Sequence, residues 1–234
     1  QGDEDFRQAI AAYLHQSRGV LCTPEQIIVG AGVDYLLLLL AQILGADTVF
    51  AMENPSYMQA WRILSHLHFK IEPIGLDRHG MNIRDLQAGT ANVAYVTPSH
   101  HFPLGIVMPI RRRQEILAWA CEQPDRYIIE DDYDSEFRWV GKPLPTMFGL
   151  DKTGRVIYMN TFSMTIAPSV RISYVCLPPE LYERWIQRLG FCSCPVPAFE
   201  QSTLARFISG GHFERHINRM RKHYRKVREL ALRL

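Results

Sequence analysis

The chain has 234 residues, of which 47% are hydrophobic and 21% are charged, and its formal net charge is +2. This is the composition of an ordinary soluble globular protein, and the small net charge gives no general electrostatic reason to expect a nucleic acid or a membrane surface as partner. The longest apolar run, residues 35–41, is too short to span a bilayer. Five cysteines without a paired Cys or His motif predict free thiols in a reducing cytoplasm and no metal site.

The chain alternates between helical patterns and short β-rich runs. Phe6, Ile10, Tyr13 and Leu14 recur at helical spacing and predict an opening helix. Helices are also expected at residues 36–44, 56–67 and 111–122, and the first of these is apolar nearly all round, which predicts burial on every side. Runs of apolar and β-branched residues predict seven strands, at residues 27–29, 48–52, 70–74, 93–97, 127–130, 156–159 and 172–177.

This order of elements predicts an α/β fold with three layers, α/β/α, around a mostly parallel, seven-stranded sheet. Ligands of such sheets bind beyond the carboxyl ends of the strands, so the residues that follow each strand are the candidates for a site.

After Pro178 the pattern becomes helical, with helices expected at residues 181–189 and 213–234. The second of these is rich in Arg and Lys, which is one signature of nucleic-acid binding. However, it also carries an apolar stripe at helical spacing, so we favour a packed helix with a solvated basic face. The stripe consists of Phe213, Ile217, Met220, Tyr224, Val227 and Leu230.

Two motifs follow the early strands. Gly30-Ala31-Gly32, followed by Val33 and a helix, leaves backbone N–H groups open at a positive helix terminus, which suits a phosphate, although glycines also serve any tight turn. In the second motif, residues 53–57, Tyr57 stands at the start of a helix. There it either stacks on a planar ligand or packs against the sheet.

Two further motifs follow the later strands. Residues 128–136 run from an apolar strand into five carboxylates, and no His or Cys ligand accompanies them to suggest a metal. A carboxylate at a strand end with a tyrosine two residues later, such as Asp131 and Tyr133, can hold a protonated ring nitrogen and a phenolic oxygen. Residues 160–171 combine hydroxyl side chains with Arg171, whose fixed-geometry donors suit a phosphate.

Together these motifs resemble the class I/II, fold-type-I aminotransferases that depend on pyridoxal 5′-phosphate (PLP). They are most similar to the aminotransferase-like domain of MocR-type transcriptional regulators of the GntR family. Three segments carry the resemblance: residues 96–105 (VTPSHHFPLG), 130–138 (EDDYDSEFR) and 161–171. Their order and spacing agree with the family across nearly the whole chain.

The resemblance implies a role for each matched residue. Asp131 would pair with the pyridinium nitrogen and keep it protonated, which makes the ring an electron sink. Tyr133 would hydrogen-bond the ring O3′, Tyr57 would stack on the ring face, and Ser99 would lie on the O3′ side. The phosphate would be held by the backbone amides of Gly32 and Val33 and by the side chains of Thr161, Ser163 and Arg171.

The sequence departs from the family at two positions. Phe102 stands where ordinary aminotransferases carry an asparagine, which favours the regulator-type subfamily. Met164 stands where the family has the catalytic lysine that binds the cofactor as a Schiff base. A thioether has neither amine nor basicity, so PLP would bind only noncovalently and transamination would be impaired, while the similar volume should preserve folding. A natural loss, an introduced substitution and a sequencing error are all compatible with the sequence.

The resemblance also implies an organisation and partners. Residues 1–178 would form the PLP-binding large domain, truncated at its N-terminal side, and residues 179–234 a helical segment leading toward a small C-terminal domain that is largely absent. A homodimer and an amino-acid-like ligand are expected, and DNA only through a domain outside this chain. Three functions stay open: an effector- and cofactor-sensing domain of a regulator, which we favour; a PLP-dependent aminotransferase; and a structural remnant that binds no cofactor.

Overall fold

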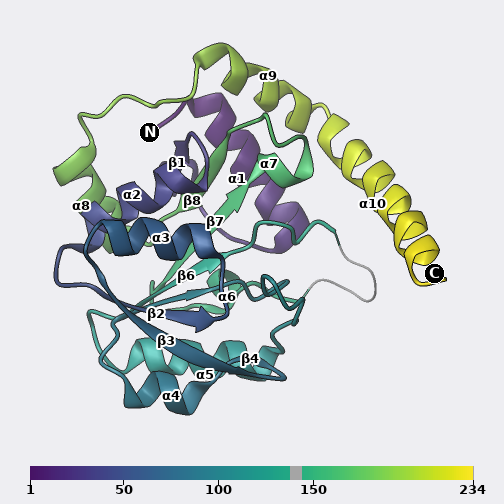
Figure 1. The fold of residues 1–234 in the computed structure, drawn as a ribbon. Coiled ribbons are helices and arrows are strands. Elements are labelled where there is room, and N and C mark those ends of the chain that lie inside the picture. Colours follow the sequence, from purple (N-terminus) through teal and green to yellow (C-terminus); the bar gives the residue numbers. More distant parts are fainter. Residues whose placement is uncertain (138–143, 234) are drawn as a thin grey trace.

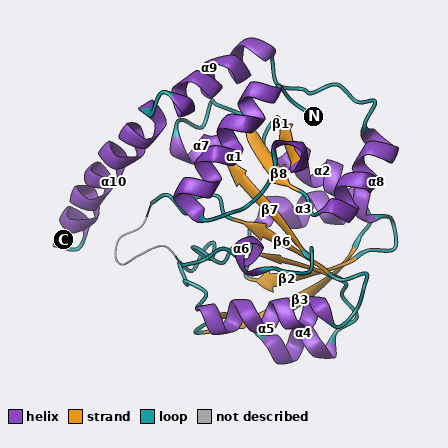
Figure 2. Cartoon of the chain, turned by 180° about the vertical axis from the view of Figure 1, so that it is seen from behind, coloured by secondary structure: helices purple, strands orange, loops and turns teal. Residues whose placement is uncertain are grey.

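The computed structural model describes residues 1–137 and 144–233, so Arg138, the last residue of the acidic motif, and Leu234, the end of the predicted C-terminal helix, lie outside the described residues. One eight-stranded sheet forms the centre, in the order β1-β8-β7-β6-β5-β2-β3-β4 (Figures 1 and 2). The strands are β1 (Ile27–Gly30), β2 (Val49–Asn54), β3 (Lys70–Asp77), β4 (Gly80–Met81), β5 (Val93–Val96), β6 (Tyr127–Asp131), β7 (Val156–Thr161) and β8 (Ser173–Cys176).

The sheet is mostly parallel, as the sequence predicts. β3, β2, β5, β6 and β7 pair in parallel, β8 is antiparallel to both of its neighbours, and β4 is antiparallel to β3. The predicted count of seven strands was wrong by one. The additional strand, β4, has only two residues and returns on β3 through a turn at Arg78 and His79. Two residues are too few to produce a periodic hydrophobic pattern.

Helices cover both faces of the sheet, which confirms the three layers (Figure 1). They are α1 (Glu4–Arg18), α2 (Val33–Leu44), α3 (Met58–His66), α4 (Ile83–Ala88), α5 (Ile110–Cys121), α6 (Met147–Leu150), α7 (Phe162–Thr165), α8 (Pro179–Leu189), α9 (Ala198–Ser209) and α10 (His212–Ala231), with a short 3-10 turn at Pro24–Gln26. No helix within the described ranges is both long and apolar enough to cross a membrane.

The alternation of side chains along β7 shows how the two faces divide. Ile157 and Met159 pack into the core with α2, α3 and α8. Val156 and Tyr158 point to the opposite face, where Val156 packs with α4, α5 and α6 and Tyr158 packs with α1, α9 and α10. Because β7 is buried on both sides, its first four residues, Val156 to Met159, form a continuous apolar run rather than an alternating pattern.

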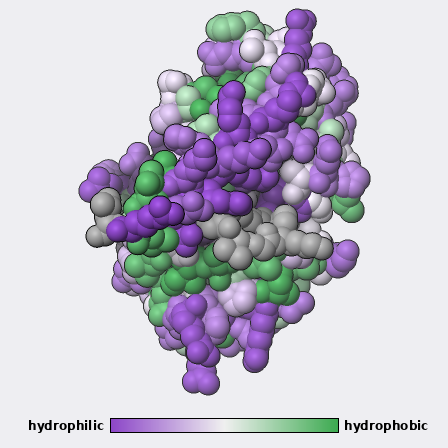
Figure 3. Space-filling model, turned by 90° about the vertical axis from the view of Figure 1, so that its right-hand side faces the viewer, coloured by the Kyte–Doolittle hydropathy of each residue, from purple (hydrophilic) through white to green (hydrophobic). Residues whose placement is uncertain are grey.

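Two predictions about the helices need correction. The prediction of burial on every side of α2 was wrong, because Leu38 is 42% exposed. The apolar stripe of α10 is buried only in its first half: Phe213 and Ile217 are buried, whereas Val227 and Leu230 are exposed. The second half of α10 projects from the body of the molecule (Figure 1), and hydrophilic side chains predominate across the middle of that side (Figure 3).

The fold places the candidate motifs at one edge of the sheet. β2, β5, β6 and β7 run in the same direction, so their carboxyl ends lie at the same edge. β1 and β8 pair in register from Gly30 with Ser173, which brings the loop before α2 beside the segment that precedes β8. The sequence motifs at 30–33, 53–57, 97–103, 131–136 and 161–171 therefore converge.

Candidate functional site

A cavity of about 360 Å³ opens at this carboxyl edge. Asp131 and Arg171, which are 40 residues apart in sequence, line the same cavity, as the interpretation of the sequence requires. The described residues that line it are Val33, Asp34, Tyr57, Thr97, Phe102, Asp131, Tyr133, Asp134, Thr161, Ser163, Met164 and Arg171.

Asp131 ends β6 at the floor of the cavity and is only 3% exposed. The hydroxyl of Tyr95 donates a hydrogen bond to its Oδ2. Its Oδ1 is buried and has no hydrogen-bond partner among the described residues. Burial, reinforced by the charges of Asp132 and Asp134, raises the pKa of Asp131 to about 7 even though the Tyr95 hydrogen bond acts in the opposite direction. A buried carboxylate oxygen without a partner is costly, so a ligand that brings a donor to Oδ1 gains affinity.

The raised pKa of Asp131 has a measurable consequence for stability in the absence of ligand. An aspartate in the unfolded chain has a pKa of about 3.9, so between about pH 4 and pH 7 the folded state holds a proton that the unfolded state releases. Stability from this group is therefore lost as the pH rises through that window. We expect Asp131→Asn to be more stable than the parent chain at pH 8, by on the order of 2–4 kcal/mol, and much closer to it at pH 4.

Denaturant unfolding of both ligand-free proteins at the two pH values measures this difference. Burial also raises the pKa values of Glu53, Glu130 and Glu136 to about 7. These acids contribute the same pH slope to both proteins, so the difference between the proteins isolates Asp131. An equal stability gap at pH 4 and pH 8 would contradict the assignment.

The other side of the cavity is built around the start of α2. Gly32 precedes the first turn of α2 with a φ of +97°, a conformation that favours glycine. A Cβ atom at Gly32 would lie 2.6 Å from Nη2 of Arg171, so a side chain there would displace the guanidinium. Arg171 is half exposed, and its Nη2 lies 3.2 Å from Oδ2 of Asp34. Free helix N–H groups and a guanidinium next to each other form an anion cradle.

The hydroxyl groups of the predicted phosphate motif also organise the loop itself. Thr161 caps α7 by accepting a hydrogen bond from the backbone N–H of Ser163 at 3.2 Å, and it accepts another from the hydroxyl of Ser173 at 2.8 Å. The Ser163 hydroxyl donates to the carbonyl of Val170 at 2.7 Å. These bonds fold residues 161–173 into a compact turn that presents Ser163 and Arg171 to the same cavity.

Aromatic side chains and Met164 complete the wall. The rings of Tyr57 and Phe102 meet edge to face, with centroids 6.0 Å apart. The Tyr133 hydroxyl donates to the backbone carbonyl of His100 at 3.2 Å. Met164 is 50% exposed at the cavity, in the middle of the single turn of α7. The position at which the resemblance predicts the family's lysine therefore lines the cavity with a side chain that can neither accept nor donate a proton.

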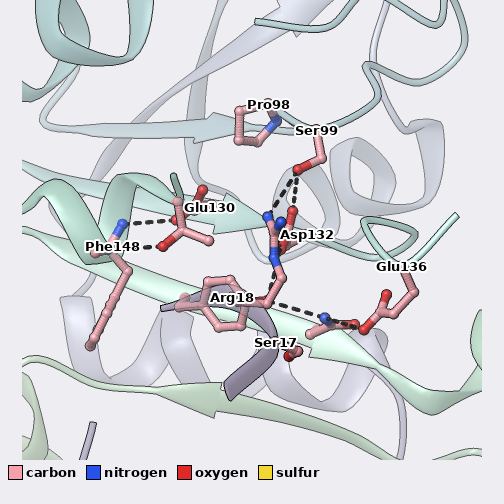
Figure 4. Close-up of polar contacts among 12 residues, drawn as sticks. Ser17, Arg18, Pro98, Ser99, Glu130, Asp132, Glu136 and Phe148 are labelled. Atoms are coloured by element: carbon pink, nitrogen blue, oxygen red, sulfur yellow. Dashed lines mark hydrogen bonds and ion pairs between the residues drawn. The ribbon is translucent and has the colours of Figure 1, made fainter. Parts of the chain in front are cut away.

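Gly32, which lies beside Arg171, and Ser99 are the two predicted site residues that are absent from the described lining of the cavity, and Ser99 belongs to a buried polar network instead. Its hydroxyl donates a hydrogen bond to Oδ1 of Asp132 and accepts one from Arg18 at 3.4 Å. Arg18 in turn pairs with Oδ2 of Asp132 at 2.8 Å, and Tyr158 donates to the same oxygen at 2.8 Å. Figure 4 shows Arg18 reaching toward Ser99 and Asp132 in this buried network. The placement of Ser99 beside the cofactor's O3′ stays a prediction.

Four lining residues were not assigned a role from the sequence: Asp34, Thr97, Phe102 and Asp134. Asp134 belongs to the acidic run and Asp34 directly follows Val33, so proximity to assigned residues was an available signal. Phe102 had been noted only as a departure from the family pattern. Thr97 directly follows β5 and belongs to the segment 96–105 that carries the family resemblance, so its position was also an available signal.

Residues 1–233 match the protein family described as aminotransferase class I and II. This chain belongs to that family. Among its relatives, it is 46% identical over 231 residues to an uncharacterized HTH-type transcriptional regulator, YdeL, of Bacillus subtilis (strain 168), covering 99% of this chain and 50% of that protein. It is 40% identical to the probable rhizopine catabolism regulatory protein MocR of Rhizobium meliloti, covering 95% of this chain and 45% of that protein. It therefore spans about half the length of the curated relatives it matches.

Solved structures of aminotransferases share the fold. The kynurenine aminotransferase of Pyrococcus horikoshii, solved in complex with pyridoxamine phosphate (PMP), superposes with a TM-score of 0.87 at 28% identity, covering 99% of this chain and 59% of that one. The multiple substrate aminotransferase of Thermococcus profundus gives a TM-score of 0.88 at 27% identity, covering 99% and 60%. The chain thus has the fold-type-I architecture, and its similarity to MocR-type regulators, expected from the motifs, is confirmed.

Proposed function

We propose that this aminotransferase-like chain is the effector- and cofactor-sensing domain of a GntR/MocR-type transcriptional regulator and that it holds PLP without a covalent bond. In this proposal Asp131 binds the ring nitrogen, Tyr133 binds O3′, and Tyr57 contacts the ring face, while the backbone of Gly32 and Val33 and the side chains of Thr161, Ser163 and Arg171 hold the phosphate. When bound, PLP supplies an electron sink for chemistry at an amino-acid carbon.

The observation that carries the proposal is the buried, unpartnered Oδ1 of Asp131 in the cavity that Arg171 also lines. A protonated pyridine nitrogen is a donor of the kind that this oxygen lacks among the described residues. The anion cradle at Gly32 and Arg171 suits a phosphate for an independent reason, the positive end of α2 next to a guanidinium. PLP carries both groups on one ring.

The residue at position 164 favours sensing over catalysis. Met164 has no group that can hold or move a proton, so transamination loses its general base, while binding through Asp131 and Arg171 does not require one. A sensor needs only a change of conformation on binding. The relatives that are transcription regulators support this proposal. An amino-acid-like effector, a homodimer, the division at residues 178 and 179, and DNA binding through a domain outside this chain belong to the same proposal.

A second candidate function, transamination between an amino acid and a 2-oxo acid, is favoured by one observation: Asp131, Tyr133 and Arg171 line one cavity. A third, the structural remnant, requires that this cavity bind no cofactor.

The proposal is tested by equilibrium dialysis with PLP, followed by borohydride reduction and intact mass measurement. The expected result is that each chain retains about one PLP under native conditions. After borohydride reduction, no cofactor mass is expected at any residue that lines the cavity. Peptide mapping distinguishes labelled surface lysines. Failure to retain PLP would overturn the sensor and the enzyme together and leave the remnant.

A further inference from the structure

The lining of the cavity carries more negative than positive charge. Among the described residues that line it, three are acidic, Asp34, Asp131 and Asp134, and one is basic, Arg171. Nη2 of Arg171 lies 3.2 Å from Asp34, which leaves two carboxylates without a cationic partner from the lining. A cavity surrounded by protein amplifies such an imbalance, because low dielectric strengthens charge interactions.

Two phenols in the cavity report the same negative potential. The pKa of Tyr133 is raised, first by burial and then by the charges of Asp134 and Asp131. The pKa of Tyr57 is also raised, by burial and by Asp34 and Asp131, while Arg171 acts in the opposite direction. Since these phenols come from different loops, the negative field extends across the cavity.

Asp134 is the carboxylate with capacity for a further cation. Its Oδ2 lies 2.9 Å from Nδ1 of His100, whereas its Oδ1 is buried and has no hydrogen-bond partner within the described part of the chain. Asp131 is committed to the ring nitrogen in the proposed function, and Asp34 already lies beside Arg171. A cationic group on the ligand would therefore find its partner in Asp134.

Met164 removes the advantage that an aldehyde would have in this cavity. A lysine at this position would add a positive charge and capture the aldehyde of PLP covalently. The thioether of Met164 does neither, and it leaves the acidic character of the lining uncompensated. A ligand that carries an amine in place of the aldehyde loses no covalent bond when methionine stands in place of lysine. The surrounding negative charge favours its ammonium group.

We propose that the cavity binds the amine form of the cofactor, PMP, in preference to the aldehyde form, PLP, and that Asp134 provides the charge that favours the ammonium group. This inference rests on the proposed function and names the ligand class of that same site. The chain would then sense the aminated state of the cofactor pool without carrying out the amination.

Isothermal titration with PMP, PLP and pyridoxine 5′-phosphate tests the proposal. The third ligand keeps ring and phosphate but carries a neutral hydroxyl, so it is free of any reaction between PLP and surface lysines. We expect PMP to bind about tenfold or more tightly than either of the others, as a hydrogen bond to a charged group implies. Asp134→Asn should reduce this preference to about twofold or less, whereas Asp125→Asn, an exposed aspartate outside the cavity, should preserve it.

The possible outcomes separate the inference from the function beneath it. If none of the three ligands binds, the proposed function fails. If all three bind and PLP or pyridoxine phosphate binds as tightly as PMP, the proposed function stands and the preference is wrong. If PMP is preferred equally by the chain and by Asp134→Asn, the role of Asp134 is wrong.

Discussion

A Met164→Lys variant is expected to carry about one cofactor per chain after incubation with PLP and borohydride reduction, attached at residue 164, whereas the parent chain carries none there. Met164 is half exposed at the cavity, so a lysine in its place reaches the same space with an amine at its end. Ser163 and Thr161 hold the turn of α7 through backbone and hydroxyl hydrogen bonds that do not involve residue 164. The substitution therefore adds a nucleophile without disturbing its frame.

Peptide mapping and the visible spectrum of the reconstituted variant measure this gain. Met164→Gln is the matched control. Glutamine, like lysine, is a long side chain with a polar tip, but it has no amine, so this variant should behave like the parent chain. A Met164→Lys protein that binds PLP reversibly yet remains unlabelled would show that residue 164 does not face the bound ring. A labelled Met164→Gln protein would place the reaction at another residue.

Arg18→Met is expected to lower the free energy of unfolding by about 3–5 kcal/mol, the usual effect of breaking one side of a buried ion pair. Arg18 ends α1, and its Nη2 lies 2.8 Å from Oδ2 of Asp132, whose side chain is completely buried. Without Arg18, the carboxylate keeps only hydroxyl partners among the described residues, from Ser99 and Tyr158. A buried charge with neutral donors alone is poorly compensated.

Denaturant unfolding with matched m-values measures this effect. The matched control is Arg184→Met, which removes an arginine from a solvent-exposed pair with Glu180 on α8 and should cost less than about 1 kcal/mol. A double change, Arg18→Met with Asp132→Leu, should recover part of the loss because no charge remains buried. Equal effects of Arg18→Met and Arg184→Met would contradict the structural role of the network.

The fold was largely readable from the sequence, because buried strands and packed helices leave hydrophobic patterns. The first residues of β6 and β7, 127–129 and 156–159, are buried and appear as continuous apolar runs in the chain. The hydrophobic pattern failed to predict β4, which is too short to show a period. It also failed at Leu38, where the apolar composition of α2 led to a prediction of burial for a residue that is exposed. The hydrophobicity of a helix gives its average environment and does not show which of its faces meets solvent.

The site was readable to the extent that its residues follow strands. Asp131, Tyr133 and Arg171 were placed by that rule and by the family resemblance, and the structure brings them to one cavity. The ion pair between Arg18 and Asp132 joins residues that are 114 positions apart in the sequence, and no local sequence pattern predicts it. The same network explains why Ser99 contacts Asp132. A buried carboxylate needs hydrogen-bond donors, and the Ser99 hydroxyl supplies one.

The central claim is that one cavity holds a pyridoxal ring by its nitrogen and its phosphate at the same time. Diffraction from crystals soaked in PMP tests this most directly. The account predicts electron density for one ligand in the cavity, with the ring nitrogen at Oδ1 of Asp131 and the phosphate at the start of α2 beside Arg171. Ligand density elsewhere on the molecule, or a ring turned so that its nitrogen faces away from Asp131, would contradict it.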